Sequence, residues 1–229
     1  GLLHLAYPGS YTLGQSGAET ANADLNWDSD GIASKGFTSL TVADGTLELG
    51  ANRSAATVKG GVSVGVRYAA SSAPVLKITG GTFNSDALYL DRGYSSSTRL
   101  LVPTFEVSNC STATLANVYT ESGGNSSHVS SSVLASKGCG ALLKVTGYCS
   151  IGKDRYGTNV LNTLDGAQFQ HTANSKDYSQ RIGLEIGGTE SDRGGGVRIK
   201  RTVWNIDGST GSVYAAYLNR GSEINIKNG

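Results

Sequence analysis

Ile182-Gly183-Leu184-Glu185-Ile186-Gly187-Gly188 is a short run of alternating apolar residues that passes directly into a glycine-rich turn. Similar strand-and-turn segments recur at residues 87–93, 150–155 and 214–221. Four apolar residues mark the recurrence at a spacing of 33 residues, and they are Val118, Ile151, Leu184 and Tyr217. A repeat of about 20 to 50 residues is the usual sign of a solenoid, because a single repeat cannot bury its apolar face without its neighbours.

A second apolar series lies between the copies of the first. It has the order apolar, polar, apolar, small polar, then Gly or Asn, and it occurs at residues 76–81, 105–109, 143–147, 204–208 and 224–228. Alternation at period two places the flanking apolar side chains on one face of a strand and the middle Lys, Glu or Asn on the other. The Gly or Asn that follows supplies the positive φ of a sharp corner. The local order is therefore strand, corner, strand.

We expect an all-β chain that forms a single-stranded, right-handed parallel β-helix, or solenoid, over residues 37–229. Residues 1–36 do not share the repeat and are expected to form an irregular N-terminal cap or connector. Residues 121–138 contain a polar run without an apolar period, and we expect a loop excursion there. The alternative is a β-sandwich or jelly roll, which needs antiparallel hairpins, and the chain has few Asp-Gly pairs in hairpin positions.

The composition describes one folded domain with many turns. The chain has 229 residues, among them 32 Gly, 3 Pro and no Met. Its formal net charge is +1, from 19 basic and 18 acidic residues, so we expect no nucleic-acid partner. No run of 18 apolar residues occurs, so no membrane span is expected. A start at Gly1 without an initiator Met is expected of a fragment or a mature form.

The three cysteines do not match a metal site, and no cofactor is expected. Cys110 and Cys149 follow two similar strands. If these strands lie on adjacent rungs, the two backbones are about 4.8 Å apart, which a disulfide accepts. The other interpretation is that both are buried thiols that act as small apolar residues. Cys139 is left unpaired in either case.

The segment Lys77-Ile78-Thr79-Gly80-Gly81-Thr82-Phe83 shows the apolar-x-apolar strand followed by a Thr-Gly-Gly corner. This pattern resembles the β-solenoid passenger regions of autotransporter-type surface proteins and, more distantly, the stems of phage tailspikes. The resemblance covers residues 37–229 and implies an extracellular or surface-displayed location. No catalytic motif of these families matches residue by residue, so the resemblance implies architecture and location only.

Acidic and basic residues recur together in the predicted turns. The pairs are Asp91-Arg92, Asp154-Arg155, Asp192-Arg193 and, in the last copy, Asn219-Arg220. Such a ladder can bind an acidic polysaccharide through pairs between guanidinium groups and carboxylates. The alternative is a solvated edge whose exposed ion pairs contribute little to the stability of the fold. Tyr94 and Tyr156 lie in polar turns, where they can stack on sugar rings. Trp204 occupies an apolar strand position and is expected in the core.

Other candidate sites are incomplete in the sequence. Asn26, Asp28 and Asp30 match the first ligands of a calcium loop, but Phe37 stands where the bidentate Glu belongs, so a plain turn is the better interpretation and weak calcium binding the alternative. The three histidines are expected at the surface. Six carboxylates near turns are candidates for catalysis: Asp86, Asp91, Asp154, Asp177, Glu185 and Glu190. No two of them can be assigned as a catalytic pair from the sequence, so the catalytic residues stay unknown.

The sequence thus predicts an extracellular structural or adhesive β-solenoid rather than an enzyme. We expect it to present turn residues to a glycan or to a host or cell surface, and either to associate end to end with copies of itself or to continue into further repeats. The alternative function is a polysaccharide-binding or polysaccharide-cleaving module of the tailspike kind.

Overall fold

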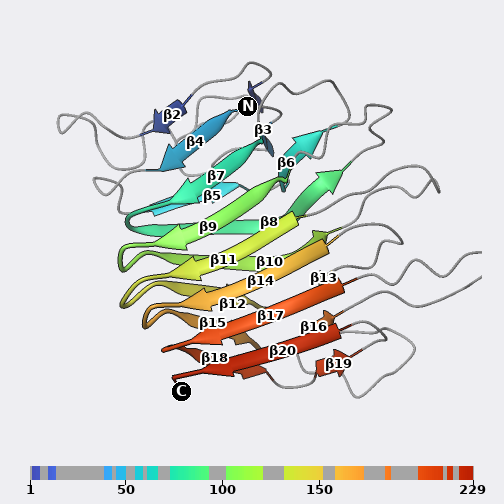
Figure 1. Cartoon of the computed structure of the whole chain (residues 1–229). Helices are drawn as coiled ribbons and strands as arrows, with labels where there is room; N and C mark the ends of the chain where they lie inside the picture. Colours follow the sequence, from blue (N-terminus) through green and yellow to red (C-terminus); the bar gives the residue numbers. More distant parts are fainter. Residues whose placement is uncertain are drawn as a thin grey trace, which may run out of the picture.

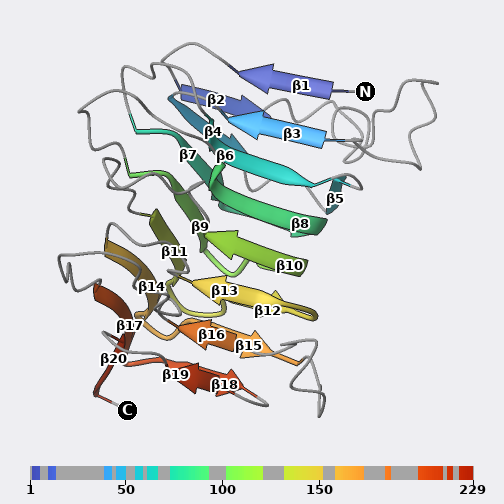
Figure 2. The same cartoon turned by 90° about the vertical axis from the view of Figure 1, so that its right-hand side faces the viewer.

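The computed structural model is a stack of parallel strands that runs from the N-terminal to the C-terminal end (Figure 1). The strands form two sheets that face each other across the core (Figure 2). The structure describes residues 2–5, 10–13, 39–42, 45–49, 55–58, 61–66, 73–92, 102–120, 132–151, 158–172, 184–186, 201–213, 216–218 and 222–228.

One sheet has eight strands and the other has twelve. The eight-stranded sheet consists, in spatial order, of β2 (Ser10–Leu13), β4 (Thr46–Leu49), β7 (Val75–Ile78), β9 (Thr104–Ser108), β11 (Ser132–Lys137), β14 (Thr158–Leu164), β17 (Arg201–Asp207) and β20 (Ser222–Lys227). The twelve-stranded sheet consists of β1 (Leu2–Leu5), β3 (Ser39–Val42), β5 (Ala55–Val58), β6 (Val62–Val66), β8 (Thr82–Arg92), β10 (Thr112–Thr120), β12 (Leu142–Val145), β13 (Cys149–Ile151), β15 (Gln168–His171), β16 (Leu184–Ile186), β18 (Thr210–Val213) and β19 (Ala216–Leu218).

The twelve-stranded sheet contains two columns of strands. The first half of β8 pairs with β5 and its second half pairs with β6. Likewise, β10 pairs with β12 through its first half and with β13 through its second. After β10 the two columns continue as separate short strands. A complete rung therefore has three segments, one in the eight-stranded sheet and two in the twelve-stranded sheet.

Every pairing between described strands is parallel, and no helix occurs among the described residues. The predicted parallel β-solenoid is thus confirmed, and the sandwich, which needs antiparallel strands, is excluded. It follows that no helix in these ranges is long and apolar enough to cross a bilayer.

The ends of the predicted segments differ from the observed strands. β1 and β2 lie within residues 1–36, the expected cap, and they extend both sheets by pairing with β3 and β4. β11 begins at Ser132, inside the expected loop excursion 121–138, and pairs with β9 and β14. Residues 14–38 and 121–131 lie outside the described ranges.

The fixed spacing of 33 residues does not give the true register. Val118 pairs with Cys149 and Cys149 pairs with Leu184, while Ile151 pairs with Ile186 instead of Leu184. Leu184 in turn pairs with Ala216, one residue before the predicted Tyr217. The prediction is therefore wrong by two residues at Ile151 and by one at Tyr217, because the connections between strands differ in length from rung to rung.

The second apolar series is also divided between two sheets. Leu76, Phe105, Trp204 and Ile224 share one column of the eight-stranded sheet, as expected. The residue of that column on β11 is Leu134, whereas Leu143 lies on β12 in the other sheet. The pattern apolar-Lys-apolar-Thr-Gly at 143–147 is thus a strand of the opposite wall.

The core lies between the two sheets and consists of stacked apolar side chains. Phe83 and Phe105 come from opposite sheets, and their side chains are 1% and 0% exposed. Their ring centroids are 6.1 Å apart. Trp204 is 3% exposed, which confirms its predicted place in the core. Opposite Trp204 lies Gly211, where a Cβ would come within 2.5 Å of the indole ring. The small residue on one wall thus leaves space for the large one on the other.

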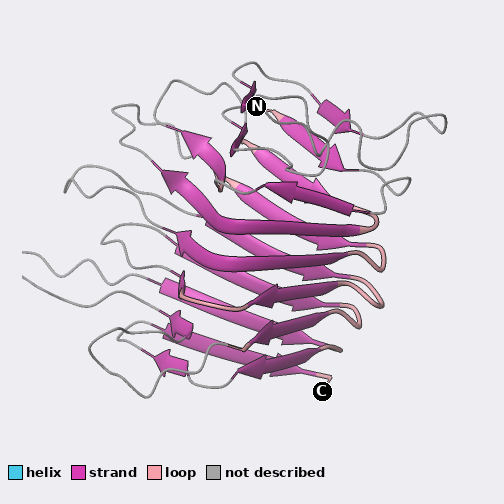
Figure 3. Cartoon of the chain, turned by 180° about the vertical axis from the view of Figure 1, so that it is seen from behind, coloured by secondary structure: helices cyan, strands magenta, loops and turns pink. Residues whose placement is uncertain are grey.

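Tight corners join the eight-stranded sheet to the twelve-stranded sheet along one edge of the stack (Figure 3). The corners at Gly81, Asn109 and Gly208 have positive φ, as predicted. Successive corners are also hydrogen-bonded to each other, for example from Gly138 N to Leu164 O at 3.0 Å and from Gly166 N to Gly208 O at 2.9 Å. These bonds continue the sheet pairing around the turn and hold the corners one strand spacing apart.

Candidate functional site

Most residues predicted from the sequence to bind a ligand lie outside the described ranges. These are Tyr94, Asp154, Arg155, Tyr156, Asp192, Arg193 and Arg220, together with the calcium candidates Asn26, Asp28 and Asp30. Asp177 and Glu190, from the list of carboxylates, lie outside them as well. The predicted charged ladder along these turns therefore stays a prediction.

Asp91 and Arg92 are not in a turn, contrary to the prediction. They are the last two residues of β8, and Arg92 pairs with Val66 of β6. Glu185 is likewise a strand residue, paired between Ser150 and Tyr217. Asp86 is exposed in the middle of β8, where the carbonyl of Asp86 accepts a hydrogen bond from Asn117 Nδ2 at 3.2 Å.

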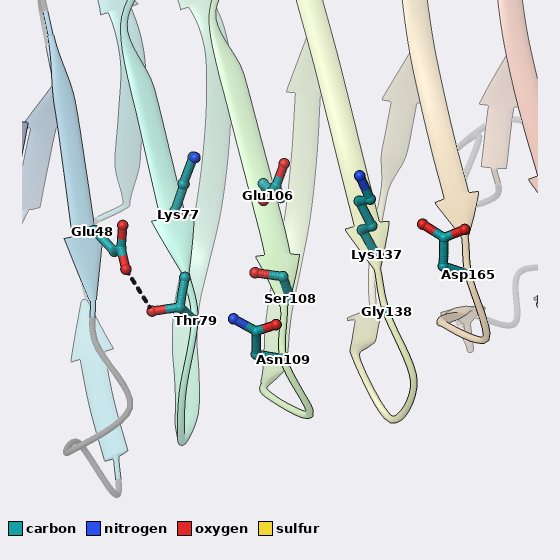
Figure 4. A pocket seen from close by; sticks show the side chains of 9 residues that line it. All are labelled: Glu48, Lys77, Thr79, Glu106, Ser108, Asn109, Lys137, Gly138 and Asp165. Atoms are coloured by element: carbon teal, nitrogen blue, oxygen red, sulfur yellow. Dashed lines mark hydrogen bonds between the residues drawn. The ribbon is translucent and has the colours of Figure 1, made fainter.

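A shallow polar depression of about 370 Å³ lies on the outer face of the eight-stranded sheet, next to the tight corners. Its charged lining comes from five successive strands or the corners that follow them, and consists of Glu48, Lys77, Glu106, Lys137 and Asp165. Figure 4 shows these side chains projecting from the same face of the sheet. Thr79, Ser108, Asn109 and Gly138 complete the lining at the ends of β7, β9 and β11.

Strand register brings the charged residues into rows. Glu48 pairs with Lys77, and Lys77 pairs with Glu106, so charges of alternating sign occupy neighbouring strands about 4.8 Å apart. Lys137 pairs with Ser108 two positions further along, where it faces the corners. Three carboxylates and two ammonium groups give the depression a formal charge of −1. The local charge is thus nearly balanced.

Hydrogen bonding within the depression is sparse. The hydroxyl of Thr79 lies 3.1 Å from Glu48 Oε1 and 3.0 Å from the carbonyl oxygen of Leu49. Among the nine lining residues this contact with Glu48 is the one hydrogen bond that joins two of them (Figure 4). The carboxylate of Glu106 and the ammonium group of Lys137 therefore face solvent with their polar atoms available to a ligand.

The row that contains Glu48, Lys77 and Glu106 continues beyond the depression as an asparagine ladder. Asn205 Nδ2 donates to Asn162 Oδ1 at 3.0 Å, and Asn225 Nδ2 donates to Asn205 Oδ1 at 3.1 Å. Here, unlike in the depression, neighbouring side chains satisfy each other across the strands. The same outer row thus has a charged, open half and an amide-paired half.

Three tyrosines form a second row on the outer face of the twelve-stranded sheet. Tyr89 and Tyr119 stack with ring centroids 5.1 Å apart and planes inclined by 11°, and Tyr148 follows with its centroid 5.4 Å from that of Tyr119. Because the rings of Tyr89 and Tyr119 face each other, those faces are not available to a sugar ring. We interpret the row as cross-strand packing and not as a platform for glycans.

His171 is buried, in contrast to its expected place at the surface. It is 2% exposed, and its Nε2 lies 2.7 Å from the carbonyl oxygen of Gly147. Burial lowers the pKa of the imidazole below its usual 6.5, against the opposing effect of that hydrogen bond. Nδ1 is buried with no hydrogen-bond partner among the described residues, so His171 is a neutral core residue.

The cysteines are arranged differently from the pairing considered in the sequence. Cys149 is fully buried on β13 next to Val118, and burial raises the pKa of its thiol, so it is a protonated core residue. Cys110 lies in the corner after β9, so the considered disulfide between Cys110 and Cys149 is not formed. The neighbour of Cys110 is Cys139, in the corner after β11.

The depression was not predicted from the sequence, although its signal was present there. The middle residues of Leu47-Glu48-Leu49, Leu76-Lys77-Ile78 and Phe105-Glu106-Val107 were expected on the outer face, but only the register places them side by side. Within the described ranges, no three His, Cys, Asp or Glu side chains converge as a metal site would require. Comparison with protein-family models, with curated proteins and with solved structures finds no match to this chain.

Proposed function

We propose that the chain is a structural or adhesive β-solenoid, displayed outside the cell, whose polar depression binds a glycan. The observation that carries the proposal is the row of charges on Glu48, Lys77 and Glu106, in register on three adjacent strands. Carboxylates accept hydrogen bonds from sugar hydroxyls, and ammonium groups donate to sugar oxygens.

The shape and charge of the depression support a glycan over other ligands. Its lining is polar, whereas sites for drug-sized apolar molecules are enclosed and mostly apolar. Its formal charge of −1 gives no attraction for nucleic acid or another polyanion. Neighbouring polar groups repeat at the strand spacing, which suits a chain of similar units.

The test is binding of the full chain to an immobilised panel of neutral and uronic-acid oligosaccharides. Glu106→Gln and Lys137→Gln each remove one charge-assisted hydrogen bond, and we expect each to weaken binding by about tenfold or more. Lys227→Gln is the matched control, because Lys227 is an exposed lysine of the same sheet that does not line the depression. Equal binding by all three variants, or no binding to any glycan of the panel, would overturn the proposal.

Glycan cleavage is the second candidate, and one observation favours it. Glu48 and Glu106 lie on the same face of β4 and β9, with β7 between them, so their backbones are about 10 Å apart. Inverting glycosidases hold two carboxyl groups about 6.5–9.5 Å apart around the scissile bond, which these side chains can reach. Release of reducing ends from the bound glycan, abolished by Glu48→Gln and by Glu106→Gln alike, would identify an enzyme. Binding without release would identify an adhesin.

We also propose that the stack continues past its last described rung, by pairing with a further repeat or with a second copy of the chain. At the last described rung, β20 pairs with β17 on one side, and Ile226 is 67% exposed there. An uncovered strand edge and an exposed apolar side chain favour pairing with further β-structure. Light scattering over a range of concentrations should show association that Ile226→Lys reduces. A strict monomer at all concentrations would count against it.

A further inference from the structure

Cys110 and Cys139 occupy neighbouring corners on the same edge of the stack. β9 and β11 pair up to the positions of Ser108 and Lys137, directly before the corners. The chains are paired again after the corners, where Leu142 N donates to Ser111 O at 2.9 Å. The backbones of the two corners are thus one strand spacing apart, about 4.8 Å, at both the start and the end of the corner. A disulfide requires Cα atoms about 4.4–6.8 Å apart, so this separation is suitable.

The two cysteines are also in direct contact. Cys110 Sγ lies 2.9 Å from the carbonyl oxygen of Cys139, and both residues are exposed. Gly140 makes room for this thiol, because a Cβ on Gly140 would lie 3.1 Å from Cys110 Sγ. Cys110 itself has φ of +61°, a conformation that few residues other than Gly and Asn adopt. The corner therefore holds the Cys110 thiol against the neighbouring rung.

We propose that Cys110 and Cys139 are a modification site, at which a disulfide forms between the two corners. The oxidant is a small-molecule disulfide such as oxidised glutathione. One cysteine thiolate attacks it, giving a mixed disulfide and releasing one glutathione, and the second thiolate then displaces the other glutathione. The two protein thiols lose two protons and two electrons in total, and one oxidised glutathione becomes two reduced molecules.

The cross-link ties together two rungs beside the polar depression. It closes a loop from residue 110 to residue 139 and thereby restricts the unfolded chain, which stabilises the fold. Asn109 and Gly138, the residues just before the two cysteines, line the depression. The disulfide forms whether or not the depression binds a glycan, so the two proposals fail independently.

Peptide mapping of the unmutated chain tests the proposal directly. The chain is incubated folded with oxidised glutathione, its remaining thiols are alkylated, and it is digested with trypsin without reduction. Cleavage after Arg99, Lys137, Lys144 and Lys153 separates the three cysteines into peptides 100–137, 138–144 and 145–153. We expect peptides 100–137 and 138–144 to be joined by a disulfide. Peptide 145–153 should be recovered unlinked and alkylated at Cys149 once the chain is unfolded, because the buried thiol does not react with oxidised glutathione in the folded chain.

Thermal unfolding gives a second measurement. The oxidised chain should melt about 5 °C or more above the reduced chain. Cys110→Ser and Cys139→Ser should each abolish that difference, and Cys149→Ser is the control that should keep it. The proposal is overturned if each exposed cysteine ends as a separate glutathione adduct, or if Cys149 is the partner in the linked peptide. It is also overturned if the link joins two different chains.

Discussion

Phe169 and Trp204 meet edge to face across the core, with ring centroids 5.4 Å apart and planes inclined by 76°. They come from β15 and β17, which lie in opposite sheets, so the pair ties the two walls together. Trp204 Nε1 also donates a hydrogen bond of 3.2 Å to Thr163 Oγ1 on the preceding strand of its own sheet. The indole thus has both an apolar contact across the core and a buried polar partner.

Trp204→Ala should lower the free energy of unfolding by about 3–5 kcal/mol, because it leaves a cavity and an unpaired Thr163 hydroxyl. Urea denaturation followed by circular dichroism measures the change. Lys227→Ala is the control, since Lys227 is exposed on the last rung, and it should change stability by about 0.5 kcal/mol or less. Equal effects of the two substitutions would contradict the assignment of Trp204 to the core.

Gly147→Ala should destabilise the chain by steric overlap. A Cβ at this position would lie 2.4 Å from the carbonyl oxygen of Ala116 and 2.8 Å from Asn117 Oδ1. We expect a loss of about 1–3 kcal/mol in urea denaturation, since the backbone of the neighbouring rung must move.

The matched control for Gly147→Ala is Gly208→Ala. Gly208 has φ of +56°, but a Cβ there meets nothing within 4 Å. Only backbone strain remains at this position, so the expected loss is about 1 kcal/mol. If Gly208→Ala proved the more damaging change, the close approach of the two rungs at Gly147 would be refuted.

The asparagine ladder should show graded losses of stability. Asn205→Ala removes two side-chain hydrogen bonds, to Asn162 and from Asn225, whereas Asn225→Ala removes one. At about 1 kcal/mol for each bond, the free energy of unfolding should fall by about 2 and about 1 kcal/mol. Urea denaturation of both variants measures the ratio, and an equal loss in both would show that the ladder is not connected.

Stability should fall in mild acid through His171. Burial lowers its pKa in the folded chain below the ordinary 6.5, so between these two values the unfolded chain binds the proton that the folded chain does not. The contribution of the neutral imidazole is therefore fully present above the unfolded pKa, and it decreases as the pH falls through 6.5 towards the folded pKa.

His171→Asn removes this titration from the core. The stability advantage of the unmutated chain over the variant should be larger at about pH 7.5 than at about pH 5. Chemical denaturation at both pH values measures it. Because His4 and His128 are present in both chains, their titration cancels in the comparison. An advantage that is constant with pH would show that His171 is not held neutral.

Local sequence patterns predicted the strands and corners well, because the formation of a strand or a corner depends on residues that are adjacent in the sequence. Leu76-Lys77-Ile78 and Phe105-Glu106-Val107 became strands with their apolar side chains inward, and Asn109 turned the corner with positive φ. Which sheet a strand joins depends on the whole rung. Leu143-Lys144-Val145 has the same pattern as Phe105-Glu106-Val107 and yet lies in the opposite wall.

The candidate site could not be predicted from local sequence patterns, because its residues are brought together by the register between rungs. Glu48, Lys77 and Glu106 are 29 residues apart along the chain, while Lys137 lies 31 residues after Glu106 and in a different row. Cys110 and Cys139 come together only because a corner of one rung stacks on a corner of the next. The predicted spacing of 33 residues does not identify these neighbours, because the rungs differ in length and here the partners are 29 residues apart.

From β7 onward, one edge of the stack has uniformly short connections. From β7 onward, the chain passes from the eight-stranded to the twelve-stranded sheet through residues 79–81, 109–111, 138–141, 165–167 and 208–209 alone. The return connections range from residues 219–221 to residues 187–200. Foreign peptides inserted into the return connections should therefore leave the strand register intact, whereas insertions into the tight corners should shift it. The fold is in this sense a scaffold for displaying peptides, with one edge that tolerates insertions and another that does not.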